Sequence, residues 1–252
     1  MAQTKDPGTV LVTGAGRRLG RAIALDLGGR GWRVGVHYGT SAAAALELVA
    51  EIEDSGGRAA AFCADLADFE ALAPLVETCA KTLGAPICLI NNAALFEQDT
   101  LATLDAGSWQ AHLDVNLRAP VFLTRAFART LPEGVQGNVV NLIDQKVLRL
   151  NPDYFSYTVT KAALWTATQM MAQALAPRVR VNAIAPGPVL RSEGQSEADF
   201  EREYRLTLLR RPVAPEEVPA VVRFLLETPS VTGQMIALDA GQHLAWNGQE
   251  DS

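Results

Sequence analysis

The stretch VLVTGAGRRLGRAIA, residues 10–24, decides the fold. A β-branched apolar run leads directly into glycines at positions 14, 16 and 20, and an apolar helix-forming run follows. Glycines in a strand-to-helix turn let the backbone approach a pyrophosphate, and the next helix supplies free N–H groups and a positive dipole. The spacing departs from the strict GxGxxG pattern, and such turns also occur without a ligand. Its place between the first strand and the first helix favours a dinucleotide site.

Seven short apolar runs alternate with longer amphipathic stretches along the chain. Several runs are apolar throughout, which is typical of strands covered on both faces by helices. The alternation predicts an α/β fold: a single-domain, Rossmann-type, doubly wound parallel sheet of about seven strands over residues 1–252. A long stretch near 186–211, bounded by Gly, Pro and Ser, is predicted to be an irregular substrate loop. The predicted strands are 9–13, 33–38, 59–63, 87–91, 138–143, 179–184 and 234–238, and the helices 18–30, 41–55, 68–83, 106–130, 155–176 and 215–227.

Composition excludes several classes of function. The 252 residues carry 22 Lys+Arg against 28 Asp+Glu, a net charge of −6, and no basic block, which argues against nucleic acid or an anionic membrane as partner. The first residues lack the apolar stretch of a signal peptide, and no run is long enough to span a bilayer. Three cysteines and three histidines stand far apart, so we expect reduced thiols and no metal site. These features predict a cytoplasmic globular protein.

The end of the second predicted strand bears on the choice of cofactor. NAD enzymes place a carboxylate about 20 residues beyond the glycines, on the ribose 2′-hydroxyl. Here that strand closes on His37, Tyr38, Thr40 and Ser41 without a carboxylate, and Arg17 and Arg18 lie in the glycine turn. Arginine, histidine and hydroxyl groups attract a 2′-phosphate, whereas an acid repels it. The sequence therefore predicts NADPH; the alternative is that the arginines are solvated surface charges.

Tyr157 and Lys161 stand near the start of a long apolar helix. Residues i and i+4 share a helix face, so the phenol and the ammonium converge on one site. A neighbouring cation stabilises the phenolate and lowers the tyrosine pKa from about 10, so that the hydroxyl can donate a proton as hydride arrives. Taken alone, Tyr-x-x-x-Lys is far more often a surface i,i+4 pair than a catalytic one.

Further motifs occur in order along the chain, and together with them the Tyr157–Lys161 pair indicates a catalytic site. They are the glycine turn 13–20, Asn91-Asn92-Ala93-Ala94, Asn116, Tyr157 with Lys161, and Pro186-Gly187. Together they resemble the short-chain dehydrogenase/reductase family over essentially the whole chain. The resemblance implies hydride transfer from NADPH to a carbonyl or imine, and a homotetramer.

Thirteen residues before Tyr157, where most of that family carries a serine, this chain has Asp144. A carboxylate accepts hydrogen bonds only, so it repels a developing alkoxide and raises the pKa of a nearby phenol. An acid there suits a nitrogen heterocycle better than a ketone. The arrangement resembles the pteridine reductase branch, including bacterial dihydromonapterin and dihydrofolate reductases, which also share Arg18-Leu19-Gly20 and the His37-Tyr38-x-x-Ser41 motif.

The same resemblance implies roles for individual residues. Tyr157 is the proton donor, Lys161 lowers its pKa and holds the nicotinamide ribose, Asp144 relays or orients the proton, and Asn116 supports a relay water. Phe96 stacks on the pterin, unless it is a packing ring, and Ala94 replaces a serine of the branch. Substrate contacts are expected from Arg18, Phe96, Asp144 and Tyr157. Cofactor contacts are expected from Gly14, Arg17, Arg18, Leu19, Gly20, His37, Tyr38, Thr40, Ser41, Asp65, Leu66, Asn92, Ala93, Ala94, Lys161, Pro186, Gly187 and Val189.

Three functions remain open on the sequence. The leading one is NADPH-dependent reduction of a dihydropterin to a tetrahydropterin. The second is a carbonyl or 3-oxoacyl-carrier reductase in which a protonated Asp144 donates as serine would. The third is a regulator that binds the cofactor without turnover, against which the intact Tyr157 and Lys161 weigh. Asp65 has an alternative of its own, as the N-cap of the next helix.

Overall fold

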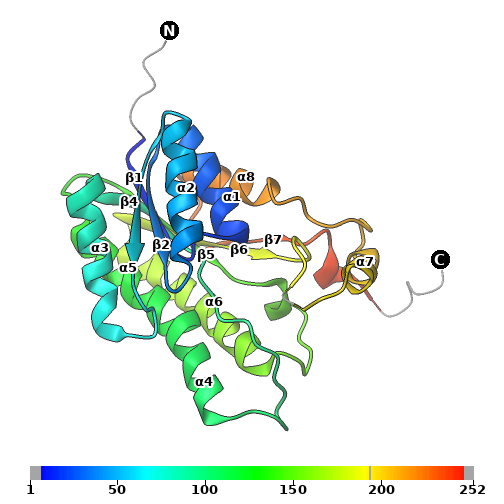
Figure 1. Ribbon diagram of the computed structural model, residues 1–252. Coiled ribbons are helices and arrows are strands. Elements are labelled where there is room, and N and C mark those ends of the chain that lie inside the picture. Colours follow the sequence, from blue (N-terminus) through cyan, green and yellow to red (C-terminus); the bar gives the residue numbers. More distant parts are fainter. Residues whose placement is uncertain (1–6, 193, 247–252) are drawn as a thin grey trace.

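The computed structural model describes residues 7–192 and 194–246. Seven parallel strands form one sheet in the order β3-β2-β1-β4-β5-β6-β7, with helices on both faces (Figure 1). This confirms the predicted fold class. The strands are β1 Thr9–Val12, β2 Arg33–Tyr38, β3 Arg58–Cys63, β4 Pro86–Asn91, β5 Gly137–Leu142, β6 Val179–Pro186 and β7 Met235–Leu238.

Two layers of helices cover the sheet. One face carries α1 (Arg18–Gly29), α2 (Ala42–Asp54) and α8 (Glu217–Glu227), and the other carries α3 (Phe69–Leu83), α5 (Ala119–Thr130) and α6 (Phe155–Leu175). Successive residues of a strand point to opposite faces. Val10 and Val12 therefore pack with the first group of helices and Leu11 with the second. This double burial is why the strands are apolar throughout.

Two expectations about the helices need correction. The predicted helix 106–130 is divided into α4 (Ala106–Leu113), a π-helical turn at Asp114–Arg118 and α5. The predicted irregular loop contains a further helix, α7 (Glu197–Arg205), whose Ser196 caps it by accepting from the Asp199 N–H. The helix has no buried residue, so it lacks the apolar stripe on which the sequence prediction relied.

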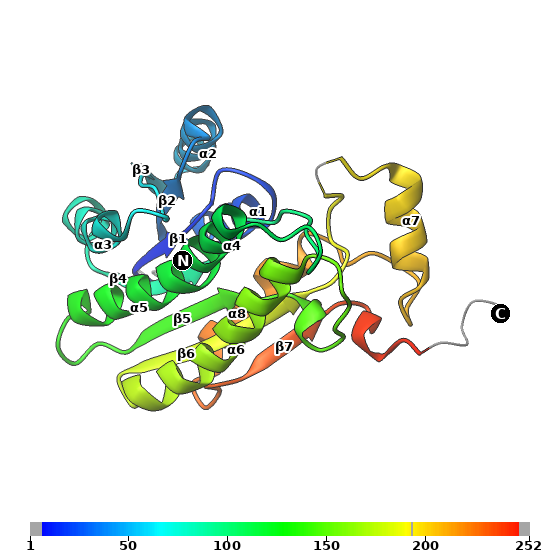
Figure 2. The same ribbon diagram turned by 90° about the horizontal axis from the view of Figure 1, so that it is seen from below.

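The order of the sheet reverses between β1 and β4, because the chain leaves β1 toward β2 and returns to its other side. Ligands of doubly wound sheets bind outside the carboxyl ends of the strands at this point. In Figure 2, α7 stands beyond those ends on the β7 side, beside the C-terminal segment that carries the 3₁₀ turn η3 (Gln242–Leu244). No helix in the described part of the chain has the length and apolarity needed to cross a bilayer.

Candidate active site

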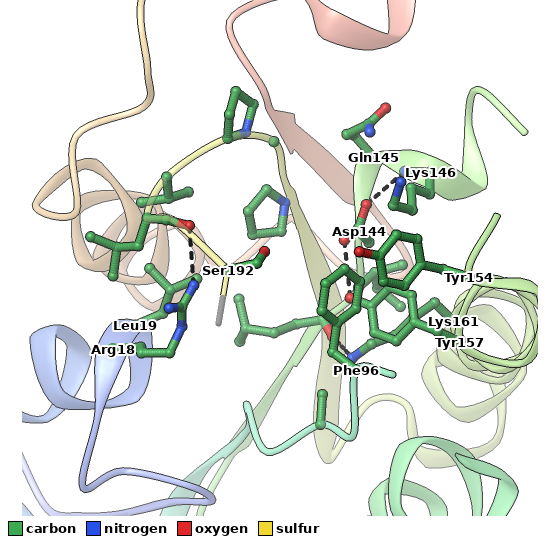
Figure 3. Close-up of a pocket in the computed structure, with 18 of the residues that line it drawn as sticks. Arg18, Leu19, Phe96, Asp144, Gln145, Lys146, Tyr154, Tyr157, Lys161 and Ser192 are labelled. Carbon is green, nitrogen blue, oxygen red and sulfur yellow. Dashed lines mark hydrogen bonds between the residues drawn. The ribbon is translucent and has the colours of Figure 1, made fainter. Parts of the chain in front are cut away.

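A cavity of about 780 Å³ opens at the carboxyl ends of the strands. The segments that follow β1, β4, β5 and β6 line it, and α7 and η3 contribute from the far side (Figure 3). It brings together most of the residues predicted from the sequence. Those predicted residues are Gly14, Arg17, Arg18, Leu19, Asn92, Ala93, Ala94, Phe96, Asp144, Tyr157, Lys161, Pro186, Gly187 and Val189.

The glycine turn is tight because two backbones meet there. Gly14 has a φ of +61°, and a Cβ on it would lie 3.0 Å from the Cα of Ala93, which follows β4. A Cβ on Gly20 would lie 2.4 Å from the Gly14 carbonyl oxygen. Both positions therefore require glycine, which explains the Gly-x-x-x-x-x-Gly spacing without a strict GxGxxG motif.

The N-terminus of α1 suits an anion. Its N-cap, Arg17, makes no side-chain cap hydrogen bond, and the first turn contains no acidic residue. Free N–H groups and the positive end of the helix dipole thus remain beside two arginines that line the cavity. The Arg18 guanidinium donates to the carbonyls of Arg191 (2.6 Å) and Leu190 (3.1 Å), which ties the glycine turn to the segment after β6 (Figure 3).

His37 does not present its ring to the cavity, contrary to its predicted role as a cofactor contact. The side chain is buried, its Nδ1 accepts from the Gly14 N–H (3.1 Å), and its Nε2 donates to the Ala64 carbonyl (3.1 Å). Burial lowers the pKa of the imidazole, so the neutral ring that these bonds require is favoured. Both nitrogens are engaged by backbone, and His37 positions the glycine turn instead of binding phosphate.

The other residues predicted at the adenosine end lie at the ends of β2 and β3, beside the glycine turn and outside the cavity lining. Thr40 is exposed, and Ser41 Oγ is 3.4 Å from the Cβ position of Gly16. Asp65 is exposed and accepts from the Ala67 N–H (2.9 Å), while Asp68 is the N-cap of α3. Asp65 is therefore not the cap that the alternative proposed. The Leu66 side chain is buried in the core on the α3 and α5 face of the sheet. Tyr38 is half-buried against the core on the opposite face.

Asn92 and Thr13 join the two sides of the switch point. The Asn92 amide donates to the carbonyls of Thr13 (2.8 Å) and Gly14 (3.1 Å). The Thr13 hydroxyl accepts from the N–H groups of Asn92 and Ala93, both at 3.0 Å. The predicted Asn92 thus holds the wall of the cavity through its side chain.

Asp144, Tyr157 and Lys161 converge at the end of β5. The Tyr157 hydroxyl donates to Asp144 Oδ2 at 3.0 Å, and Lys161 Nζ donates to the Leu142 carbonyl at 2.6 Å (Figure 3). The Lys161 ammonium lies 5.6 Å from the centre of the Tyr157 ring. Asp144 Oδ1 also accepts from the Lys146 N–H (2.8 Å), which fixes the carboxyl group at the start of the 3₁₀ turn η2 (Gln145–Val147).

Burial sets the protonation of this group. It raises the pKa of Asp144, and together with the adjacent Asp144 it raises the pKa of Tyr157 well above 10. Burial lowers the pKa of Lys161 to about 8, which the charge of Asp144 partly opposes. The raised pKa of Tyr157 agrees with the expected effect of Asp144 and holds Tyr157 protonated as a donor, while the lowering of the tyrosine pKa by Lys161 stays a prediction.

Asn116 lies in the π-helical turn, and its side chain is fully used by protein groups. Its Oδ1 accepts from the Leu95 N–H (2.8 Å), and its Nδ2 donates to the Leu95 carbonyl (2.9 Å) and to Thr160 Oγ1 (3.3 Å). It thus links the segment that carries Phe96 to the helix that carries Tyr157.

Three aromatic rings form one wall of the cavity. Phe96 stacks on Tyr154 with centroids 4.3 Å apart and an interplanar angle of 7°, and it meets Tyr157 edge-on at 4.6 Å. Phe96 remains 39% exposed, so it is not a core packing ring. Tyr154, which sequence reasoning missed, has a left-handed φ of +55° at the N-cap of α6. No local sequence motif indicates this left-handed conformation of Tyr154. The Tyr154 ring packs on Phe96.

Asp99 is a second residue that the sequence did not reveal. Its carboxylate is buried and accepts from the Ser156 N–H at 3.1 Å and from the Ser156 hydroxyl. Because the N-cap Tyr154 makes no side-chain cap, Asp99 supplies the cap of α6 from 57 residues away. The carboxylate therefore holds the first turn of the helix at Ser156, one residue before Tyr157.

Residues after β6 close the far side of the cavity. The Gly187 N–H donates to the Leu238 carbonyl (3.0 Å), and a Cβ on Gly187 would lie 2.7 Å from Asp239. Val189 is buried and lines the cavity with Pro186. Within residues 7–192 and 194–246, no cluster of His, Cys, Asp and Glu is placed to hold a metal, and Cys63, Cys79 and Cys88 are free thiols.

Comparison with known proteins places this site in context. A family model described as enoyl-(acyl carrier protein) reductase matches residues 14–243. The crystal structure of FolM alternative dihydrofolate reductase 1 from Brucella canis, complexed with NADP, is 45% identical and superposes with a TM-score of 0.94 over 100% of both chains. The corresponding Brucella suis structure is 46% identical, with a TM-score of 0.94 over 98% of this chain and 99% of the other. A 3-oxoacyl-[acyl-carrier-protein] reductase from Synechocystis is 33% identical over 92% of this chain and 95% of its own length.

Proposed function

The chain belongs to the short-chain dehydrogenase/reductase family, and from this membership we propose that it is an NADPH-dependent reductase that converts a dihydropterin to the tetrahydropterin. One observation carries the proposal. Asp144, at the position of the family's usual serine, is half-buried, has a raised pKa and accepts from the Tyr157 hydroxyl at 3.0 Å. A carboxyl group there favours a ring nitrogen that needs a proton over a developing alkoxide.

The residues present fit NADPH. The uncapped N-terminus of α1, the glycines that admit no Cβ and the adjacent Arg17 and Arg18 suit a pyrophosphate. The end of β2 carries no carboxylate to repel a 2′-phosphate. The Brucella neighbours, complexed with NADP, support the same assignment. The bound cofactor supplies the hydride, and Lys161 and the Pro186–Val189 segment hold its nicotinamide end.

The protein's own groups deliver the proton. A 7,8-dihydropterin takes hydride at C6 and a proton at N5. Tyr157, kept protonated by burial, donates its hydroxyl proton to N5, and the protonated form of Asp144 returns a proton to the phenolate through their hydrogen bond. Phe96 offers a flat face for the pterin ring, and Asp144 can also accept from a pterin N–H. The product gains two hydrogen atoms in all.

The homotetramer stays part of this proposal. Along α6, Val159 is 38% and Met170 63% exposed, although the helix is apolar over most of its length. Large apolar side chains exposed together on one helix are typical of a subunit interface.

The test is oxidation of NADPH with dihydropterins, measured beside a panel of ketones and 3-oxoacyl thioesters. We expect turnover with a dihydropterin that exceeds that of every ketone. Turnover of 3-oxoacyl thioesters alone would instead favour the reaction of the Synechocystis relative, with protonated Asp144 donating as serine does. Binding of NADPH without turnover of any compound would favour a regulator.

A further inference from the structure

A polar cluster closes the cavity on the side of α7, and the catalytic scheme does not use it. Glu203 of α7 accepts from Gln195 Nε2 (2.9 Å) through one carboxylate oxygen and from Gln242 Nε2 (3.4 Å) through the other. Glu203 and Gln242 both line the cavity. We call these three residues the carboxamide–carboxylate cluster.

The cluster lies on the substrate side of the site. Gln242 belongs to η3, which follows β7. Strand β7 is the edge strand at the end of the sheet opposite to β3. Gln242 Oε1 is 3.0 Å from the Cβ position of Gly187, and the Gln242 carbonyl accepts from Arg149, just beyond η2 (3.3 Å). The cluster therefore neighbours the nicotinamide end and the turn that carries Asp144, away from the glycine turn.

The cluster presents acceptors and negative charge. Both oxygens of Glu203 face amide donors, and among the described residues no Lys or Arg forms an ion pair with it. Gln242 Oε1 is buried without a hydrogen-bond partner. The Glu203 carboxylate lines the cavity and can only accept hydrogen bonds, so a ligand that brings hydroxyl groups is stabilised beside it. A carboxylate brought to the same place meets a like charge.

Two basic residues of the cavity, Arg18 and Lys146, are engaged away from Glu203. Arg18 is tied to the carbonyls of Leu190 and Arg191, and the Lys146 ammonium lies over the Tyr154 ring at 5.1 Å from its centre. Both lie on the walls that carry the glycine turn and the aromatic rings (Figure 3). Neither of them pairs with Glu203.

We propose that Glu203 is a specificity-determining residue that selects dihydropterins with an uncharged, hydroxylated side chain over those whose side chain ends in carboxylates, as in dihydrofolate. The proposal rests on the proposed function. Hydroxyl groups donate to the Glu203 carboxylate, whereas the glutamate tail of dihydrofolate is repelled by it.

The experiment compares three substrates: a dihydropterin with a polyhydroxylated side chain, dihydrofolate, and 6-methyl-dihydropterin, which has no side-chain donor. For Glu203→Gln we expect kcat/KM to fall about tenfold with the hydroxylated substrate, to rise severalfold with dihydrofolate, and to stay constant with the methyl compound. Glu201→Gln is the matched control, because Glu201 lies on the same helix and pairs with Arg205. It should change none of the three values.

Two further results separate the possible failures. In the wild-type protein, KM for dihydrofolate should fall as ionic strength rises, because salt screens the repulsion, and this measurement does not depend on a variant folding. A parallel change with all three substrates, or a dihydrofolate KM insensitive to salt, overturns the role of Glu203. Absence of wild-type turnover with all three overturns the proposed function itself, and with it this proposal.

Discussion

The two halves of the site use polar side chains in opposite ways. The nucleotide half lies at the ends of β1, β2 and β4. There the side chains of Thr13, His37 and Asn92 form hydrogen bonds with backbone groups. These three side chains are neutral, and burial favours the neutral form of His37. These polar side chains thus have their hydrogen-bond partners in the backbone and hold the glycine turn in place as a frame.

The catalytic half, at the end of β5 and the start of α6, buries groups that can carry charge. Asp144, Tyr157 and Lys161 all have shifted pKa values there, and burial is the largest cause of each shift. Groups with shifted pKa values mark a site prepared for proton transfer. Substitutions in this half should therefore lower turnover, and those in the nucleotide half should lower stability and cofactor affinity.

The largest effect is expected from Tyr157→Phe, which removes the proposed donor and keeps the ring. We expect kcat to fall about 10²–10⁴-fold, the usual contribution of a general acid, while the Kd of NADPH stays within about twofold. Steady-state turnover and fluorescence titration of NADPH measure the two quantities. Unchanged turnover would rule out Tyr157 as the donor and remove the contrast between the halves.

Asp144→Ser tests why this half carries an acid. We expect pterin reduction to fall about 10²-fold and ketone reduction to appear, because a serine hydroxyl donates to an alkoxide. In the wild type, kcat should decline as pH rises, both as Asp144 loses its proton from a raised pKa and as Lys161 loses its proton near its pKa of about 8. The variant should keep only the decline that belongs to Lys161. An unchanged pH profile and substrate range would contradict the assignment of Asp144.

Asp99→Ala sharpens the comparison within the catalytic half. It removes the remote cap of α6, so we expect kcat to fall about tenfold through displacement of Tyr157, and the unfolding free energy to fall by about 1 kcal/mol. Asp105→Ala is the matched control, because Asp105 caps α4 by accepting from the Gly107 N–H at 2.8 Å. It should cost similar stability at constant kcat. Equal kcat in the two variants would make Asp99 a structural cap only.

The sequence predicted what local spacing encodes. The strands, the Tyr157–Lys161 face of one helix and the lack of a carboxylate after β2 are all local patterns, and the parallel sheet follows from their alternation. Asp99 with Ser156 and Phe96 with Tyr154 are contacts between segments more than 50 residues apart, which no local pattern reports. His37 shows a further limit: the residue type suggested a phosphate contact, but the direction of its ring depends on the packing of three strands.

The smallest effect on turnover is expected in the nucleotide half, from His37→Phe. The phenyl ring fills the same space but leaves the Gly14 N–H and the Ala64 carbonyl without partners, so the unfolding free energy should fall by about 1–3 kcal/mol. KM for NADPH should rise as the glycine turn loosens, with kcat at saturating NADPH within about twofold. Urea unfolding and initial rates measure these quantities.

The pH dependence of stability completes the test of His37. Its folded pKa lies below the ordinary 6.5, so only the unfolded chain binds a proton between these two values. The contribution of His37 to stability is therefore present above pH 6.5 and is lost as pH falls through the folded pKa, and the loss should be absent in His37→Phe. If the variant instead lowered kcat as strongly as Asp99→Ala at unchanged stability, the frame and the proton-transfer group would act as one unit, and the division between the halves would be wrong.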